Sequence, residues 1–295
     1  MRSIITIFLS LTLLGITYNV TFAKALRSPV QTGENIIIAK GDIPTPEKYQ
    51  PAIESYLEFV SEQVNKMVIQ LEILQQSIQN GDLKQAQDAY VLAHQDYERI
   101  RPIVILFGNT DRTINARADY FLDQENDYRF VGFHLVEYQL FKLKNLKDAQ
   151  ASSNELLMKA RDLQKRLQVE TIEIPKLVQS SADFIEMILE TKLAGKENIY
   201  SRSDIADIAA NIQGSEEIVK VLTPFITTET LENIKSNFAK INEIINSYQL
   251  DNNKYQVYDQ LNSNDKNVLY SLLTQQAELL ATLRAQINVD VYYKY

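Results

Sequence analysis

Residues 53–81 read IESYLEFVSEQVNKMVIQLEILQQSIQNG, and this stretch decides the fold class. Its apolar positions are Ile53, Tyr56, Leu57, Val60, Val64, Met67, Val68, Leu71, Leu74 and Ile78. They recur every three or four residues, as expected for the buried face of an α-helix. Thr45-Pro46-Glu47 provides a capped start with proline in the first turn, and Gly81 provides a stop. The stretch therefore predicts a long helix that packs against others.

The same period continues through most of the chain. Asp82 should cap a second helix that Pro102 breaks, and a later helix should carry His134 and end near residue 146. Residues 152–155 read as a capping box that opens another helix. Further helix starts fall near Pro175, Asp204, Thr228 and Asn264. No stretch alternates apolar and polar residues for more than a few positions, so the chain is predicted to be all-α, with eight helices in two antiparallel four-helix bundles.

The N-terminus has the pattern of a secretory signal peptide. Arg2 is followed by an apolar run over residues 4–16 and by the small-residue site Ala23-Lys24-Ala25. The run is shorter than the roughly 20 apolar residues that a spanning helix needs. We therefore predict a cleaved signal peptide over residues 1–25, followed by a flexible leader over residues 26–44 that contains Pro, Gly and Thr without a period.

The composition limits the cell compartments and the classes of partner that fit this protein. The chain has no cysteine, which excludes a lipoprotein anchor, disulfides and thiolate metal sites. An exported chain without cysteine points to a bacterial envelope, so a periplasmic or secreted location is predicted, without membrane insertion after cleavage. The net charge is −8, and loss of the two basic residues before position 26 makes it −10. An acidic surface argues against a nucleic-acid partner and is compatible with attracting cations.

The segment Gly132-Phe133-His134-Leu135-Val136-Glu137-Tyr138 contains the first candidate site. Three-residue spacing puts His134 and Glu137 on one helix face, close enough to hold one ion. Imidazole with carboxylate suits zinc or iron better than calcium or magnesium. The alternative is a half-buried histidine beside a surface glutamate, because this pattern also arises by chance.

Several segments together resemble one protein family. They are Gly-Phe-His-x-x-Glu at 132–137, Tyr97-Glu98-Arg99-Ile100-Arg101-Pro102, Asn115-Ala116-Arg117, and Gly195 to Asp204. In this order they resemble the imelysin-like family, and within it the EfeO/EfeM branch of periplasmic iron-uptake proteins. The likeness covers nearly all of the chain after residue 45 and matches the shorter, single-module form without a cupredoxin domain.

The resemblance implies a domain over residues 45–295 with two lobes, at about 45–170 and 171–295, and a cleft between them. It also implies a metal-ion-binding component of an iron-uptake system, with an inner-membrane iron permease and a haem peroxidase as possible partners. The family name derives from a peptidase assignment, but zinc peptidases of that kind use His-Glu-x-x-His. This chain has no such motif, so we expect a binding protein rather than an enzyme.

The resemblance implies a site of five side chains, of which three match here. His134, Glu137 and Glu98 stand at family ligand positions, whereas Arg101 and Asn115 stand where the family has acids. Two carboxylates are thus lost and one positive charge is gained. At an effective dielectric constant of about 20, one unit charge 4 Å away is worth roughly 4 kcal/mol, so the change is large for a divalent ion.

Three interpretations follow for the altered site. Arg101 can take the position of the cation and form a salt-bridge cluster, in which case iron or zinc binds weakly or not at all. Arg101 can instead point away, leaving a three-ligand site that other acids assist: Asp111, Asp119 and Asp204. The third interpretation is a metal-free binding protein for an acidic polysaccharide or protein partner, because Arg101 could bind a carboxylate. His94 has the spacing of a further ligand, but a histidine on the helix surface or packed against other side chains is the commoner state.

Overall fold

The stretch at 53–81 forms a single helix, α1 (Gln50–Gln79), in the computed structural model, which describes residues 45–287. Its predicted apolar stripe is buried, with Tyr56, Val60 and Leu71 fully inaccessible. Asp82 caps α2 (Leu83–Glu98) as predicted, because its carboxylate accepts a hydrogen bond from the Gln85 backbone N–H at 2.9 Å. The predicted signal peptide and leader lie outside the described residues.

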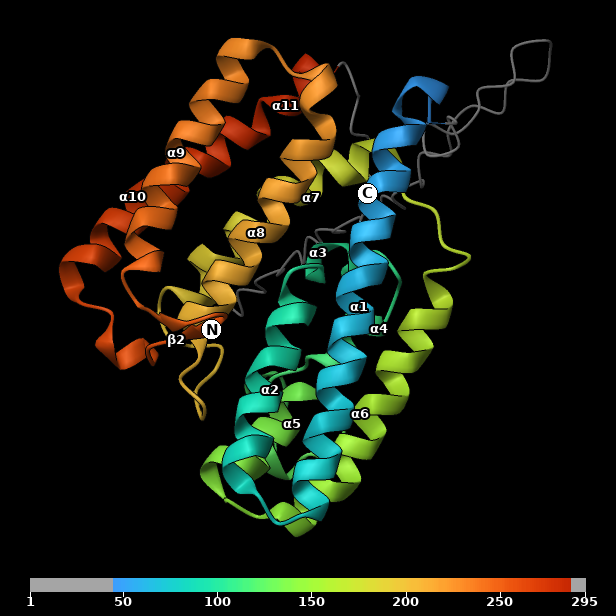
Figure 1. The fold of residues 1–295 in the computed structure, drawn as a ribbon, viewed down its shortest axis with the longest axis vertical. Helices are drawn as coiled ribbons and strands as arrows, with labels where there is room; N and C mark the ends of the chain where they lie inside the picture. Colours follow the sequence, from blue (N-terminus) through green and yellow to red (C-terminus); the bar gives the residue numbers. More distant parts are fainter. Residues whose placement is uncertain (1–44, 288–295) are drawn as a thin grey trace, which may run out of the picture. The chain divides into compact units, whose positions relative to one another are not determined.

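α1 belongs to the first group of helices, in which it runs alongside α2 (Figure 1). Besides α1 and α2 this group contains α3 (Arg101–Ile105), α4 (Thr110–Ile114), α5 (Phe133–Glu137) and α6 (Leu146–Arg166). α1 packs on both α2 and α6, and α5 packs on α6. Pro102 stands in the first turn of α3, so the predicted break after α2 is confirmed.

The second group follows along the chain, and its successive long helices reverse direction (Figure 1). It contains α7 (Ile174–Met187), α8 (Asp204–Leu222), α9 (Thr228–Asn246), α10 (Ser263–Ala281) and the short α11 (Leu283–Gln286). α7 packs on α8 and α10, and α9 packs on α10. The all-α prediction is confirmed. The lobe boundaries stay a prediction, because the described residues belong to one compact unit.

Two helix predictions are wrong in detail. The helix that carries His134 does not continue regularly to residue 146, because a π-helical turn over Tyr138–Lys142 replaces its second half. The Leu143 N–H there bonds the carbonyl of Tyr138, five residues back, at 3.0 Å. A matching π-helical turn, Ile188–Lys192, follows α7. Such turns are rare and occur often at functional sites.

The predicted capping box over residues 152–155 lies inside a helix instead of starting one. α6 begins at Leu146, where the Asn145 side chain accepts a hydrogen bond from the Asp148 N–H at 3.2 Å. The Ser152 hydroxyl, which would be the cap in this box, donates back to the Ala149 carbonyl at 3.3 Å and so caps nothing. Serine hydroxyls can bond either a free N–H or an earlier carbonyl, and sequence alone does not separate the two.

A small hairpin is the exception to the helical pattern in residues 45–287. β1 (Gln249–Asp251) pairs antiparallel with β2 (Lys254–Tyr255), and Gln249 lies opposite Tyr255. The sequence pattern predicts no strand here, because segments of three and two residues are too short to show alternation.

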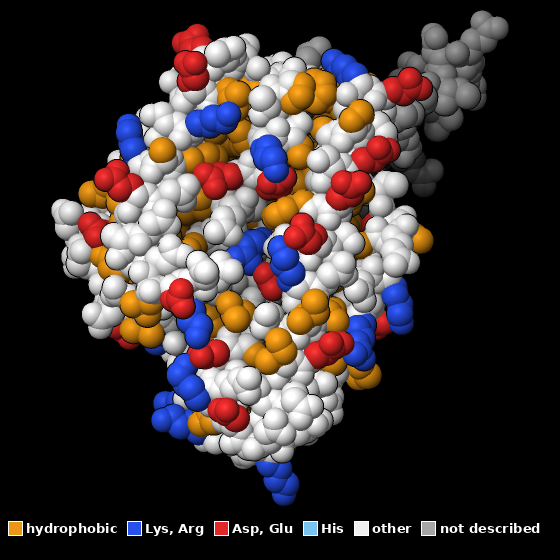
Figure 2. Space-filling view, viewed as in Figure 1, with side chains coloured by type: hydrophobic (Ala, Val, Ile, Leu, Met, Phe, Trp, Pro, Cys, Tyr) orange, Lys and Arg blue, Asp and Glu red, His pale blue; other side chains and the backbone are white. Residues whose placement is uncertain are grey.

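Acidic and basic side chains are mixed over the face shown in Figure 2. Apolar side chains on this face are scattered among them. Within the described residues, the helices are all too short or too polar to cross a membrane.

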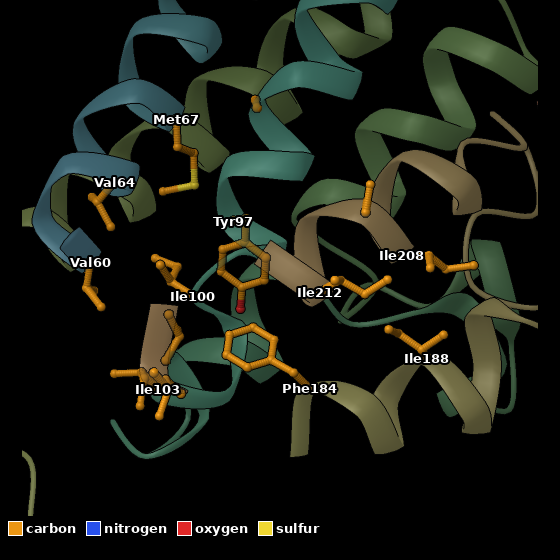
Figure 3. Packing of buried hydrophobic residues seen from close by; sticks show 14 of the residues in the cluster. Val60, Val64, Met67, Tyr97, Ile100, Ile103, Phe184, Ile188, Ile208 and Ile212 are labelled. Atoms are coloured by element: carbon orange, nitrogen blue, oxygen red, sulfur yellow. The ribbon is translucent and has the colours of Figure 1, made fainter. Parts of the chain in front are cut away.

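The two groups of helices share a continuous core. α2 and α1 both contact α8, and α3 contacts α7. Tyr97 of α2 and Phe184 of α7 face each other where the groups meet (Figure 3), and both side chains are fully buried. The predicted site residues lie along this junction, so both groups contribute to their surroundings.

Candidate metal-binding site

Glu98, the last residue of α2, is fully buried and surrounded by donors. Its Oε1 accepts hydrogen bonds from Asn115 Nδ2 and Arg101 Nη1, both at 3.2 Å. Its Oε2 accepts from Asn211 Nδ2 at 3.0 Å and lies 3.0 Å from Lys192 Nζ. Burial raises the pKa of Glu98, but Lys192 and Arg101 outweigh it and lower the pKa to about 2. Both oxygens of Glu98 are therefore already engaged.

Arg101 and Lys192 join Glu98 to a second buried carboxylate, Glu197. Arg101 Nη1 donates to Glu197 Oε1, and Lys192 Nζ lies 2.9 Å from Glu197 Oε2. Arg101 Nε also donates to Asp111 Oδ1 at 3.0 Å. The guanidinium is thus directed inward and held by carboxylates on three sides.

His94, one turn before Glu98, is fully buried rather than on the helix surface. Its Nδ1 lies 2.9 Å from Asp207 Oδ2, and its Nε2 lies 2.9 Å from Asn115 Oδ1. The Asn115 amide is oriented by Glu98, because its Nδ2 donates to that carboxylate. Burial lowers the pKa of His94, but Asp207 and Glu98 together raise it to about 9. Both ring nitrogens therefore face acceptors, and the charged form is favoured.

These residues form a buried cluster whose charges balance, which we call the charge-balanced cluster. Its buried members are three carboxylates, Glu98, Glu197 and Asp207, and three cationic groups, Arg101, Lys192 and His94. Asp111, which also pairs with Arg101, is partly exposed and lies at the edge of the cluster. Ligand atoms of His94, Glu98 and Asp207 lie within 4.8 Å of one another, close enough for metal coordination. However, an ion placed there would meet the positive charges of Arg101 and Lys192 and would have to displace a proton from His94. The donor set fits an internal salt-bridge network better than a metal.

His134 and Glu137 lie on one face of α5, as their spacing predicts, but they bond each other. His134 Nδ1 lies 2.8 Å from Glu137 Oε2. Glu137 Oε1 accepts from the backbone N–H groups of Tyr200 and Ser201, at 3.1 and 2.8 Å, and from the Ser201 hydroxyl at 2.9 Å. In a neutral imidazole, donation from Nδ1–H to this carboxylate leaves the lone pair on Nε2.

The Nε2 atom of His134 is buried and has no hydrogen-bond partner among the described residues. His134 lines a cavity of about 260 Å³, whose other polar walls include Asp119, Glu197, Tyr200 and Lys196. The Tyr200 hydroxyl donates to Glu125 at 2.6 Å. A buried imidazole with a free lone pair at a cavity wall has the features of a ligand for a metal ion.

Gly132 sets the entry into α5 and hence the position of His134. Its φ of 84° lies in the left-handed region, and a Cβ here would lie 2.1 Å from the carbonyl oxygen of Ile114. Only glycine combines this conformation with so close an approach of the two backbones.

The three acids that were expected to assist a three-ligand site, Asp111, Asp119 and Asp204, lie in different places. Asp111 is tied to Arg101 and accepts from the Tyr97 hydroxyl at 2.7 Å. Asp119 lines the His134 cavity, where both its oxygens accept from Arg117 at 3.0 and 3.1 Å. Asp204 is buried at the start of α8, and burial raises its pKa to about 7.

The five predicted positions thus fall into two adjoining sets. Glu98, Arg101 and Asn115 belong to the charge-balanced cluster, and His134 with Glu137 borders the cavity. The ring centroids of His94 and His134 are 5.5 Å apart and connect the two sets.

Sequence reasoning missed Lys192, Glu197 and Asp207. A signal for Lys192 was present, because it stands four residues after Ile188 on an apolar stripe. Asp207 follows Asp204 by three residues on a helix that is otherwise apolar on that side. Both are charged residues at core positions, which are rarely found without a partner.

Comparisons with known proteins agree with this fold. The model of the Imelysin family (Peptidase M75) matches residues 52–283. The chain is 34% identical over 242 residues to "Iron uptake system component EfeO" of Shigella boydii serotype 4. It is 33% identical to the protein of the same name from Escherichia coli K12. Each of these matches covers 81% of this chain and 64% of the relative, so the chain spans less than two thirds of their length.

The crystal structure of an imelysin-like protein from Psychrobacter arcticum 273-4 has the same fold. It superposes with a TM-score of 0.63 at 11% identity and covers 85% of this chain and 99% of that one. The family model, the relatives and the fold agree: the chain belongs to the Imelysin family.

Proposed function

We propose that this protein is an exported, periplasmic component of an iron-uptake system and that it carries the metal ion at His134. One observation carries the proposal: His134 lines a cavity, and its buried Nε2 has no hydrogen-bond partner in residues 45–287. Relatives named as iron uptake components, at 33–34% identity, support the choice of cargo. Imidazole nitrogen is a common ligand of both iron and zinc.

In this proposal Glu137 is a positioning residue and not a ligand. Its hydrogen bond to Nδ1 fixes the orientation and tautomer of His134 and makes Nε2 more basic. Asp119 is the carboxylate chosen to join His134, because it lines the same cavity, lies outside the charge-balanced cluster and has a side chain that is 62% exposed. Glu98 supplies no ligand, because Lys192 and Arg101 neutralise it. The site is therefore weaker than one with the five groups of the family pattern.

The segment that follows Asp119 in the chain offers a surface for a receiving partner. Tyr120, Leu122 and Tyr128 are 58%, 98% and 89% exposed, and all lie in the loop that follows Asp119. The guanidinium of Arg117 stacks 4.7 Å from the Tyr120 ring, which holds that ring in place. Exposed and ordered aromatic residues are typical anchors of protein interfaces. We infer that a partner in the uptake system, such as an inner-membrane iron permease, docks here; a haem peroxidase is a further partner of the proposal.

A second candidate function has an observation in its favour. Arg117 and Lys196 line the same cavity as His134, and both could bind a carboxylate. A metal-free binding protein for an acidic polysaccharide or protein would use these cations. We do not propose a peptidase, because the second histidine that such a zinc site needs is His94, whose two nitrogens face Asp207 and Asn115.

The two histidines provide a matched pair of variants for the test. Isothermal titration of the mature chain with Zn²⁺, and with Fe²⁺ under anaerobic conditions, should show binding in the wild type. His134→Gln should abolish it, whereas His94→Gln should retain it. Glu137→Gln should weaken binding by about 10- to 100-fold. The reverse pattern in the two histidine variants would place the metal in the charge-balanced cluster. Binding of an oligouronate with no metal binding would favour the second candidate.

A further inference from the structure

Three buried side chains meet at the start of α8, behind the charge-balanced cluster. Asp204 and Asp207 lie three residues apart on the first turns of this helix, and Asn198 precedes them in the connecting loop. All three are fully inaccessible to solvent. The Asn198 backbone N–H donates to Asp204 Oδ1 at 3.2 Å, and its side-chain Nδ2 donates to Asp207 Oδ2.

Each of these three side chains has one oxygen left without a partner among the described residues. The atoms are Asn198 Oδ1, Asp204 Oδ2 and Asp207 Oδ1. The orientation of the Asn198 amide is fixed, because an ionised Asp207 can only accept a hydrogen bond. Asn198 therefore presents an oxygen, not an NH₂ group. All three unpartnered atoms are oxygens, and Asn198 forms a hydrogen bond with each of the two aspartates.

The nearby cations do not satisfy these oxygens. Lys192 pairs with Glu98 and Glu197, and His94 meets the other oxygen of Asp207. Asp204 has one backbone hydrogen bond and no ion pair in the described residues. Buried carboxylates are normally paired with a cation or bound to a metal. The N-terminus of α8 adds partial positive charge near both side chains.

We propose that Asn198, Asp204 and Asp207 form a small, oxygen-only site for a hard cation such as Ca²⁺, Mg²⁺ or Mn²⁺. Carboxylate and amide oxygens are the ligands that such ions prefer, whereas the imidazole of His134 suits iron or zinc. The site is separate from the proposed cargo site and does not depend on it. The ion joins the loop before α8 to the helix, and this same loop supplies the Tyr200 and Ser201 donors that hold Glu137. The ion therefore has a structural role.

Thermal unfolding of the mature chain, freed of metal with a chelator, tests the proposal. Ca²⁺, Mg²⁺ or Mn²⁺ should raise the unfolding temperature by about 5–10 °C when the free ion exceeds its Kd by 100-fold. Asp204→Asn should remove this shift. Asp183→Asn is the matched control, since Asp183 is a half-buried acid on α7 that is bonded to Gln179. Both this control and His134→Gln should retain the shift.

A second measurement needs no variant. The electron paramagnetic resonance signal of Mn²⁺ should broaden on binding to the wild type, and Ca²⁺ should restore the free-ion signal. Buried water is the competing explanation for the unpartnered oxygens. Absence of any ion-dependent shift in the wild type, with an Mn²⁺ signal that the protein leaves unchanged, would overturn the proposal. A shift that survives in Asp204→Asn would also overturn it.

Discussion

Replacement of Lys192 by methionine removes a central charge of the charge-balanced cluster while keeping similar volume. Lys192 Nζ lies 3.0 Å from Glu98 Oε2 and 2.9 Å from Glu197 Oε2, with no exposure to solvent. Breaking a buried ion pair leaves an uncompensated charge and is destabilising by about 3–5 kcal/mol. Arg101 still contacts both carboxylates after the change, so we expect one such penalty and not two. For a chain of this size this lowers the unfolding temperature by roughly 6–20 °C.

The pH dependence of this loss has a defined sign. In the wild type the folded-state pKa of Glu98 is about 2, against an ordinary 4.5. Its contribution to stability is therefore complete above pH 4.5 and disappears as the pH falls towards 2. In Lys192→Met, burial acts against a weaker attraction, so the folded-state pKa rises and protonation relieves the variant. The difference between wild type and variant should be largest near pH 7 and shrink as the pH falls below 4.5.

Calorimetry of both proteins from pH 7 to pH 3 measures this difference. Lys176→Met is the matched control, because Lys176 forms an exposed pair with Glu173 at 3.3 Å on α7. Exposed pairs contribute about 0–1 kcal/mol, so the control should change little at any pH. A loss in Lys192→Met no greater than in the control at pH 7 would refute the charge-balanced cluster.

Three further predictions test other parts of the account. Gly132→Ala should destabilise the protein by about 1–3 kcal/mol and weaken metal binding, because the added methyl group would lie 2.1 Å from the carbonyl oxygen of Ile114. Thermal unfolding measures the first effect and titration with Zn²⁺ the second. An unchanged unfolding temperature would contradict this prediction. Arg101→Glu combined with Asn115→Asp restores the acids of the family pattern and should raise Zn²⁺ affinity at least about tenfold, so an unchanged affinity would show that Arg101 does not weaken the site. Envelope protein should begin after residues 23–25, and mass spectrometry that finds an intact N-terminus in that fraction would disprove export with cleavage.

The helices could be predicted because their signals are local. The stripe from Ile53 to Ile78 and the Asp82 cap depend on residues within a few turns of each other. The π-helical turns at 138–142 and 188–192 could not be predicted from the sequence, because a regular α-helix fits the same apolar pattern. Their extra residue per turn depends on packing against distant helices.

The candidate site could be predicted only in part from the sequence, for a similar reason. Spacing placed His134 next to Glu137, but it did not show that Glu137 receives three donors from Tyr200 and Ser201, more than 60 residues away. The sequence singled out Arg101 as an unusual charge. It did not show that Lys192 approaches Glu98 from the second group of helices. Local patterns therefore identified the candidate side chains, whereas the tertiary fold determines which of their atoms are free.

The central claim is that the metal ion binds at Nε2 of His134, and anomalous diffraction tests it most directly. Crystals of the mature chain soaked in Zn²⁺ and measured at the zinc edge should show a peak about 2.0–2.1 Å from this atom. Glu137 should keep its hydrogen bond to Nδ1 in that structure. A peak among His94, Glu98 and Asp207, with none at His134, would contradict the account.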